Sequence, residues 1–368
     1  MQSLIKRLSR RVTRGSGWLV GSLMLALAVP AIRATPPPTD AAVNYHIVKR
    51  VVLGGNGFWD YMGFDNAHRH LFVSHGTHVM VVNADTFKVV GDIADTPGVH
   101  GIAVAPKLGR GFISDGGADQ VTVFDLKTLK TIGTVKVTGH NPDGITYDPA
   151  SQRVFTFNGR SGNSTAIDAK TLQVAGTIDL GGRPEFAVAD GRGHIYNNLE
   201  DKSTELKINT HTLKIEARWP MAPCESPSGL AIDAEHHILF AGCHNQMMAV
   251  INADTGKVIA TPAIGQGVDA NRFDPGTGLA FSSNGGGEGT LTVVKEASPT
   301  DFKVVQNAAT ERGARTMEID PKTHNVFLIT AKFGPMPPEP AGQAQGQRPR
   351  FRRPPMVPDS FTLLVLAP

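Results

Sequence analysis

The chain has 368 residues, of which 19% are charged and 40% hydrophobic, and its formal net charge at pH 7 is +3. Six basic and no acidic residues lie within residues 1–34, so the remainder of the chain carries −3. The basic pI therefore reflects the N-terminal segment and does not mark the rest of the chain as a nucleic-acid-binding protein.

The N-terminal segment, residues 1–34, has the layout of a secretory signal peptide. A cationic stretch precedes an apolar run over 18–29, and the small residues Ala31 and Ala34 follow. The run is short for a transmembrane helix. We expect cleavage after this segment, a short linker over 35–44, and a periplasmic or secreted bacterial protein without a membrane span. Sec export, twin-arginine export and an uncleaved anchor are alternatives that the sequence leaves open.

A hairpin motif recurs along the chain, for example as "FDLKTLKTIGTV" from residue 124 and "IDAKTLQVAGTI" from residue 167. The threonines shared by five copies are spaced 42, 43, 41 and 43 residues apart, at Thr86, Thr128, Thr171, Thr212 and Thr255. Each lies between two short β-branched runs, which is typical of a tight β-hairpin.

A second element recurs seven times in the same period, for example as "DGITYDPASQRVFTFNG" from residue 143. It reads as a strand, a polar turn and another strand. Two strand pairs per repeat, without helical periodicity, predict an all-β seven-bladed propeller of four-stranded blades, with a solenoid as the alternative. The expected blades are residues 57–98, 99–140, 141–182, 183–222, 223–266, 267–311 and 312–368.

The two ends of the propeller, residues 45–368, complete each other. The last repeat lacks a fourth strand, and residues 45–54 resemble an orphan fourth strand. We expect the N-terminal strand to join the last blade, because a closed ring leaves no open sheet edge. Residues 333–359 interrupt that blade and are rich in Pro, Gly and Gln, which predicts a disordered insertion that acts as a linker or docks a partner.

The "D-x-x-T" hairpins and strand ends such as "VFTFNG" resemble the YncE-like family of YVTN β-propeller repeats over residues 45–368. The resemblance implies an exported bacterial seven-bladed propeller. It also implies single-stranded DNA binding as one function, which the negative charge and few aromatics of this chain disfavour. The nucleic-acid contacts would come from the arginines of the insertion, Arg348, Arg350, Arg352 and Arg353.

The mouth of the central channel is the candidate ligand-binding site, because innermost strands begin and second strands end on one face of a propeller. The polar residues expected there are Asp60, His75, His100, Asp143, Asn158, Glu185, Asp269, Asn284 and Arg315. The alternative is a structural role, in which such side chains hydrogen-bond the backbone amides of the loops.

Five of these residues are also candidate ligands for a divalent metal: Asp60, His100, Asp143, Glu185 and Asp269. A metal would make the protein a hydrolase or lactonase-like enzyme. No HExxH, P-loop or GxSxG motif occurs in the chain, so we favour a non-enzymatic module that binds a protein or a small ligand. The sequence identifies neither the ligand nor the oligomeric state.

Aromatic residues beside the expected mouth, Phe58, Trp59 and Tyr61, could stack a ligand, but we expect Phe58 or Trp59 to pack between blades 7 and 1. Histidines in the turns of the opposite face, including His236 and His237, are expected to be solvated.

Both cysteines, Cys224 and Cys243, are expected on the same face of blade 5, where an exported protein would join them in a disulfide. A Cys-Cys-His metal site with His244 and a pair of free thiols are the alternatives.

Overall fold

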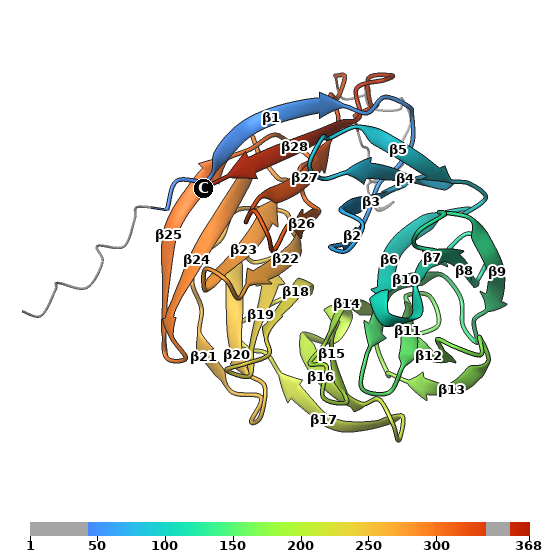
Figure 1. Cartoon of the computed structure of the whole chain (residues 1–368). Coiled ribbons are helices and arrows are strands. Elements are labelled where there is room, and N and C mark those ends of the chain that lie inside the picture. The colour runs from blue at the N-terminus through green and yellow to red at the C-terminus, as the bar shows by residue number, and fades with distance from the viewer. Residues whose placement is uncertain (1–42, 336–353) are drawn as a thin grey trace, which may run out of the picture. The chain divides into compact units, whose positions relative to one another are not determined.

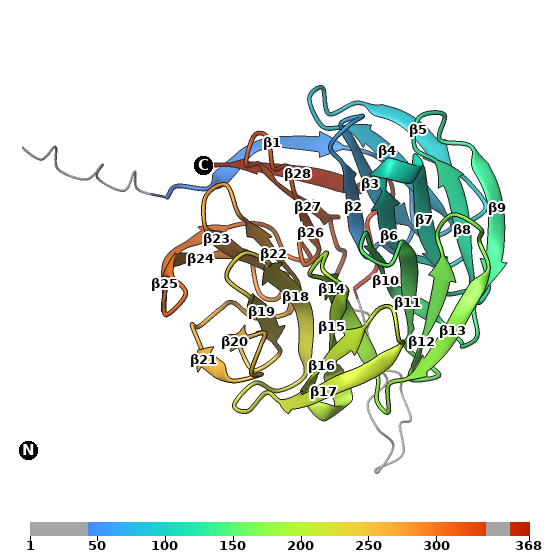
Figure 2. The same ribbon diagram turned by 60° about the horizontal axis from the view of Figure 1, so that its bottom comes forward.

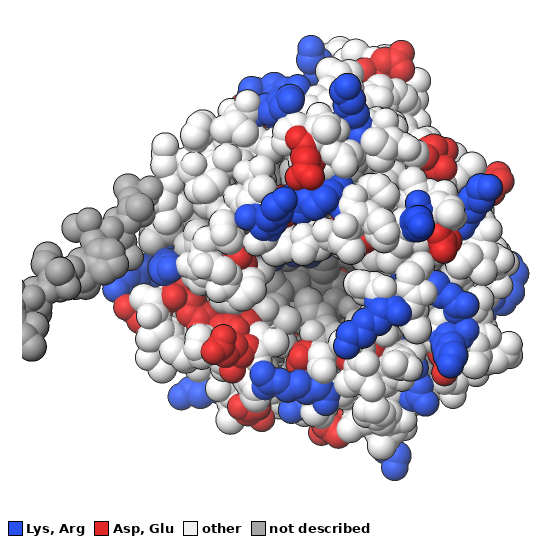
Figure 3. All heavy atoms as spheres, in the orientation of Figure 1, with Lys and Arg blue, Asp and Glu red and all other residues white. Residues whose placement is uncertain are grey.

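The computed structural model describes residues 43–335 and 354–368, which form seven four-stranded antiparallel sheets. Figures 1 and 2 show these sheets as blades arranged around a ring. The predicted seven-bladed propeller is therefore confirmed. The face seen in Figure 3 is hollowed at the centre of the ring, and side chains of both charges surround the hollow.

The strands of each blade follow one another from the channel outward. Blades 1 and 2 comprise β2 (Met62–Asp65), β3 (His70–His75), β4 (His78–Asn83) and β5 (Val89–Ile93), then β6 (Val99–Ala105), β7 (Arg110–Asp115), β8 (Gln120–Asp125) and β9 (Thr131–Lys136). Blades 3 and 4 comprise β10 (Pro142–Asp148), β11 (Arg153–Asn158), β12 (Asn163–Asp168) and β13 (Val174–Asp179), then β14 (Pro184–Ala189), β15 (His194–Leu199), β16 (Thr204–Asn209) and β17 (Lys214–Pro220).

The remaining blades have the same order. Blades 5 and 6 comprise β18 (Pro227–Asp233), β19 (Ile238–Cys243), β20 (Met247–Asn252) and β21 (Val258–Ala260), then β22 (Val268–Asp274), β23 (Leu279–Asn284), β24 (Thr290–Ser298) and β25 (Asp301–Ala309). Blade 7 comprises β26 (Met317–Ile319), β27 (Val326–Thr330), β28 (Thr362–Ala367) and β1 (His46–Val52). Two short 3-10 helices, η1 (Pro106–Leu108) and η2 (Glu200–Lys202), connect strands in blades 2 and 4.

Closure of the ring depends on the antiparallel pairing of β1 with β28, from His46 opposite Ala367 to Val52 opposite Thr362. Tyr45, which precedes β1, is buried and donates a hydrogen bond from its hydroxyl to the carbonyl of His324. The fourth strand of the last blade thus comes from the N-terminal end of the propeller, as predicted.

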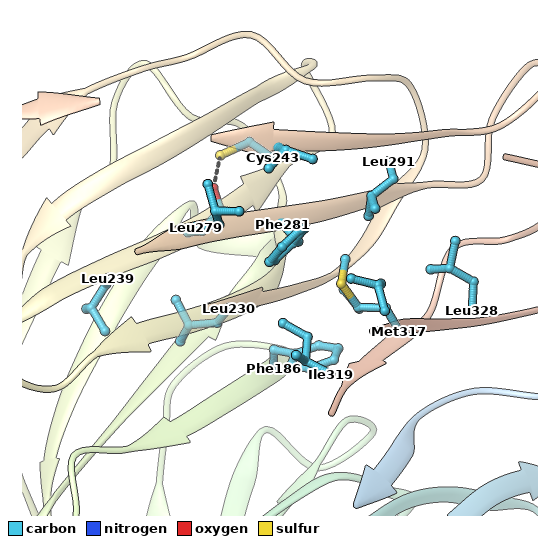
Figure 4. Packing of buried hydrophobic residues seen from close by; sticks show 14 of the residues in the cluster. Phe186, Leu230, Leu239, Cys243, Leu279, Phe281, Leu291, Met317, Ile319 and Leu328 are labelled. Carbon is cyan, nitrogen blue, oxygen red and sulfur yellow. Dashed lines mark hydrogen bonds between the residues drawn. The ribbon is translucent and has the colours of Figure 1, made fainter. Parts of the chain in front are cut away.

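The core lies between the blades because each sheet is covered on both faces by its neighbours. Every residue of β19 and β23 is buried, whereas the outermost strand β1 is mostly exposed. Figure 4 shows one such layer, in which Leu230, Phe281 and Met317 from blades 5, 6 and 7 belong to a single hydrophobic cluster. This packing holds the innermost strands at the channel.

The predicted disulfide between Cys224 and Cys243 is present, with 5.5 Å between the Cα atoms. Both residues are buried, one in the loop before β18 and the other at the end of β19. The bond uses both thiols of the chain, so the alternatives of free thiols and of a Cys-Cys-His metal site are ruled out.

Several expectations fall outside the described residues. These are the signal peptide over 1–34, most of the linker over 35–44, and the central part of the insertion with Arg348, Arg350, Arg352 and Arg353. The described ends of the insertion meet through a bridge between Phe333 and Met356. Among the described residues no helix is long and apolar enough to cross a membrane.

Reducing the disulfide should lower the free energy of unfolding by about 3 kcal/mol, because the bond closes a loop of about 20 residues in the unfolded chain. Urea unfolding of the purified protein with and without dithiothreitol measures the difference. The C224A/C243A double variant is the control and should not respond to the reductant. Equal stability of the oxidised and reduced proteins would contradict the prediction.

Candidate functional site

A ring of seven side chains surrounds the mouth of the central channel, with one contributed by each blade. Each member lies five residues before the turn residue that follows the first strand of its blade, as Asp143 lies five before Asp148. Neighbouring first strands contact one another around the ring, including β2 and β26. The mouth ring consists of Asp60, His100, Asp143, Glu185, Ser228, Asp269 and Arg315.

Backbone irregularity accompanies these positions. In five blades the pairing of the first and second strands shifts at the ring member, as between Pro142 and Ile145 in blade 3. A β-bulge redirects side chains, and bulges are frequent next to functional sites. The Ser114 hydroxyl of blade 2 accepts the backbone N–H of Gly101 at 2.8 Å and donates to the Asp143 carbonyl of blade 3 at 2.6 Å, so one side chain satisfies the irregular backbone of two neighbouring blades.

Two ion pairs occupy neighbouring parts of the mouth ring, one in blades 1 and 2 and the other in blades 6 and 7, because the first strands of blades 7 and 1 are in contact. The His100 imidazole Nδ1 lies 2.6 Å from the Asp60 carboxylate and 3.4 Å from that of Asp143. In blades 6 and 7 the Arg315 Nε lies 2.7 Å from the Asp269 carboxylate, which also accepts the Ser228 hydroxyl at 3.1 Å. The two cations of the ring thus form close pairs with two of its four carboxylates.

The remaining acids, Asp143 and Glu185, are adjacent members of the ring. Their side chains are 20% and 22% exposed. Arg183 approaches Glu185 to 3.6 Å but also pairs with Glu200, outside the ring. The ring therefore holds more negative than positive charge.

Burial and the crowding of charges move the pKa values of the ring members. Burial and the nearby Asp60 charge raise the pKa of Asp143 to about 7, and burial together with Asp143 raises the pKa of Glu185 well above its usual value. For His100, burial alone would lower the pKa, but the hydrogen bond to Asp60 and the surrounding carboxylates raise it to about 9. The site thus favours the binding of positive charge.

Aromatic side chains form the floor and part of the rim of the mouth. Tyr61 and Phe186 pack together below the acids, with 4.4 Å between their ring centroids. Burial and then the four carboxylates raise the pKa of the Tyr61 hydroxyl, which remains protonated. Phe58 is 43% exposed at the rim, with the Arg315 guanidinium 5.3 Å from its ring centroid.

Trp59, by contrast, is buried against Phe333 and Phe361 of blade 7, as expected for blade packing. A cavity of about 440 Å³ lies beside it and beside Arg315, lined also by Phe58 and Met356. A second cavity, of about 400 Å³, is lined by residues of the first strands, including the paired Arg272 and Glu318.

Three predicted members of the site, His75, Asn158 and Asn284, lie apart from the mouth ring. All three are buried inside the blades. The His75 ring packs 4.3 Å from that of Phe361, and each asparagine amide donates to side chains of the third strand of its own blade. All three lie at the ends of second strands, which the first strands separate from the channel. Their polar groups therefore contact other side chains of the blades and do not face the channel.

The predicted metal ligands separate into two sets. Asp60, His100 and Asp143 offer ligand atoms that all lie within 4.8 Å of one another, whereas Glu185 and Asp269 are not part of that group. The sequence reasoning also missed Arg183, whose place directly before the first strand of blade 4 was the available signal.

Comparison with known proteins identifies the fold alone. No protein-family model matches the chain, and no curated protein matches it. Among solved structures, one chain from "Crystal Structure of Mitotic Checkpoint Complex" superposes with a TM-score of 0.67 at 14% identity, covering 84% of this chain and 96% of that one. At this identity the similarity shows a shared β-propeller architecture, which serves many functions.

Replacing Asp60 with Asn should lower the pKa of His100 by at least about one unit. Burial disfavours the imidazolium, and the variant lacks the Asp60 carboxylate that offsets this effect. NMR titration of the His100 imidazole in both proteins measures the change. The control E288Q removes an exposed carboxylate on the β23–β24 loop and should leave the pKa near 9. A D60N protein with an unchanged pKa would show that Asp60 is not the cause.

The raised pKa of His100 in the folded protein makes the free energy of unfolding depend on pH. Since the pKa of His100 is about 9 in the folded protein and 6.5 ordinarily, its stabilisation is complete below pH 6.5 and is lost as the pH rises through 9. The difference in unfolding free energy between the wild type and H100Q should therefore shrink by on the order of 2 kcal/mol between pH 6 and pH 10. Urea unfolding at both pH values measures it, and a difference that grows with pH would contradict the assignment.

Proposed function

We propose that the protein is an exported binding propeller whose mouth ring takes up a cationic group, such as the ammonium of a small amine or of a lysine on a partner protein. The observation that carries the proposal is the convergence of four partly buried carboxylates from different blades, against only two cations in the ring. A propeller is well suited to this role because its channel mouth presents side chains from all blades at once.

The acids without a close ion pair, Asp143 and Glu185, are the proposed anchors of the cation. Both carry a raised pKa, so an entering ammonium replaces protons. The cations nearest to them are more distant than in the close pairs, with His100 3.4 Å from Asp143 and Arg183 3.6 Å from Glu185. Three N–H donors of an ammonium suit several carboxylate acceptors that surround it, and charge-assisted hydrogen bonds of this kind are the strong ones. The exposed ring of Phe58 offers an apolar surface to the body of the ligand.

A divalent metal held by Asp60, His100 and Asp143 is the second candidate, favoured by the grouping of their ligand atoms within 4.8 Å. Such an ion would activate water or polarise a carbonyl for hydrolysis. In the present arrangement the His100 Nδ1 is engaged with Asp60, so metal binding would have to displace that hydrogen bond. For this reason the cation-binding module ranks first.

Export and the YncE-like assignment belong to the same proposal. Support for export comes from the cationic and apolar pattern of residues 1–34 and from the disulfide, because such bonds persist in oxidising compartments. The family assignment rests on the repeat motifs.

Isothermal titration with spermidine tests the proposal. The wild-type protein should bind it, and the D143N/E185Q double variant should bind at least about tenfold more weakly because it loses both anchoring carboxylates. E288Q, which removes an exposed acid outside the mouth ring, is the matched control and should bind like the wild type. Equal binding by the double variant, or none by the wild type, would refute the proposal.

Affinity for spermidine should rise between pH 6 and pH 8. The pKa of Asp143 is about 7, and only the ionised carboxylate attracts the cation. Titrations at constant ionic strength measure the change, since salt screens the interaction. Tighter binding at pH 6 would contradict the assignment of Asp143.

Adding Mn²⁺ as a competitor separates the cation-binding and metal-binding candidates. A metal at Asp60, His100 and Asp143 should reduce spermidine binding, and a metal elsewhere should not.

A further inference from the structure

The face opposite the mouth carries a second pattern of charges. There the turn after the first strand places a buried aspartate in most blades, and this carboxylate accepts backbone N–H groups of its own turn. In blades 1, 6 and 7 one basic side chain pairs with each of these acids: His68 with Asp65, His324 with Asp274, and Arg69 with Asp320. Where such a base also meets a second acid, as Arg69 meets Asp85 and His194 of blade 4 meets Glu216, the second carboxylate is exposed.

Blade 5 departs from this arrangement. Asp233 pairs with His236, whose Nδ1 lies 2.6 Å from the Asp233 carboxylate. A second carboxylate, that of Glu296, enters from β24 of blade 6 and lies 3.2 Å from the same Nδ1. Two acids therefore share one imidazole.

The Glu296 side chain is unusually placed. It is 3% exposed, and within the described residues neither of its carboxylate oxygens has a hydrogen-bond partner. A buried carboxylate without a hydrogen bond destabilises a fold unless a cation or a proton neutralises it. The carboxylate therefore points to a missing positive charge.

Comparison among the repeats shows that the fold does not require an acid there. In blades 1 to 6 the corresponding residue lies within two residues of the end of the third strand and donates its N–H to a carbonyl of the turn between the first and second strands, as Glu296 does to Gly278. The corresponding residues in blades 1 to 5 are all buried and uncharged: Ala84, Leu126, Ala169, Thr210 and Ala253. Glu296 is thus a local departure from an otherwise apolar or small position.

We propose that Asp233, His236 and Glu296 bind a divalent metal ion of the zinc class that links blade 5 to blade 6. Their three ligand atoms all lie within 4.8 Å of one another. One imidazole nitrogen with two carboxylate oxygens is a donor set that suits zinc better than calcium or magnesium. The ion would replace the hydrogen bond between the His236 Nδ1 and Asp233, and unlike that bond it would also neutralise the buried Glu296 carboxylate. His236 is 46% exposed, so solvent can reach the ion and water can complete its coordination. The site lies on the face opposite the mouth ring and does not depend on the function proposed for that ring.

Zinc titration of chelator-treated protein tests this inference. All proteins carry D143N, so that the mouth group of Asp60, His100 and Asp143 does not contribute to binding. The D143N parent should bind one Zn²⁺ per chain and melt at a higher temperature when zinc is present. E296A and H236A should each bind zinc at least about a hundredfold more weakly, because each loses a direct ligand.

The control is E235A, which removes an exposed carboxylate from the same turn and should bind zinc like the parent. Since three other blades carry alanine at the position of Glu296, E296A should fold and should melt higher than the parent without zinc. In the presence of zinc the parent should instead melt at a higher temperature than E296A. Zinc binding that E296A leaves unchanged would identify an adventitious ion and overturn the proposal, as would a parent that binds no zinc or an order of melting temperatures that zinc does not reverse.

Discussion

The pairing of β1 with β28 is the constraint on which the rest of the molecule depends. It joins the first described strand to the last and closes seven sheets into one ring. Only in a closed ring do all seven first strands face one channel, with β2 against β26 as the final contact. Residues from the two ends of the chain, such as Arg69 of blade 1 and Asp320 of blade 7, then meet directly. Closure also covers the edge of β28, which would otherwise be open to pairing with another chain.

In this repeated architecture, the positions that stabilise the blades differ from the positions that carry the charged groups of the mouth ring. Most positions that face the blade interior are apolar, because packing between sheets favours buried apolar side chains. The mouth ring varies instead, with four acids, a serine, a histidine and an arginine at equivalent places. Its charges are only partly paired, which gives an otherwise structural ring the ability to attract a cation. The opposite face follows the same rule, since a single departure from the repeat, at Glu296, marks the proposed metal site.

Sequence periodicity predicted the fold, the ring closure and the disulfide, because each follows from the repeat and its two incomplete ends. It also placed six members of the mouth ring correctly at the starts of the first strands. It could not show which side chains turn inward. His75, Asn158 and Asn284 end their strands near the same face, yet they point into the blades, because that choice is made by three-dimensional packing.

The ion pairs could likewise not be predicted from the sequence. Arg315 and Asp269 come from adjacent blades, and nothing in their spacing distinguishes a closely paired acid from one with a more distant cation, such as Asp143. Glu296 could have been found by aligning the ends of the third strands, where it stands against Ala84, Ala169 and Ala253. Glu296 belongs to the sixth repeat, which lacks the hairpin threonine at the position that five other repeats share. The sequence motif therefore did not reveal that Glu296 corresponds to these alanines.

The central claim is that the mouth ring holds a cation between acids of neighbouring blades. A crystal structure of the protein with saturating spermidine tests it most directly. The account predicts an ammonium nitrogen within about 3 Å of the carboxylates of both Asp143 and Glu185, the distance of a charge-assisted hydrogen bond. Spermidine bound only elsewhere, or a mouth in which both carboxylates remain unliganded, would contradict it.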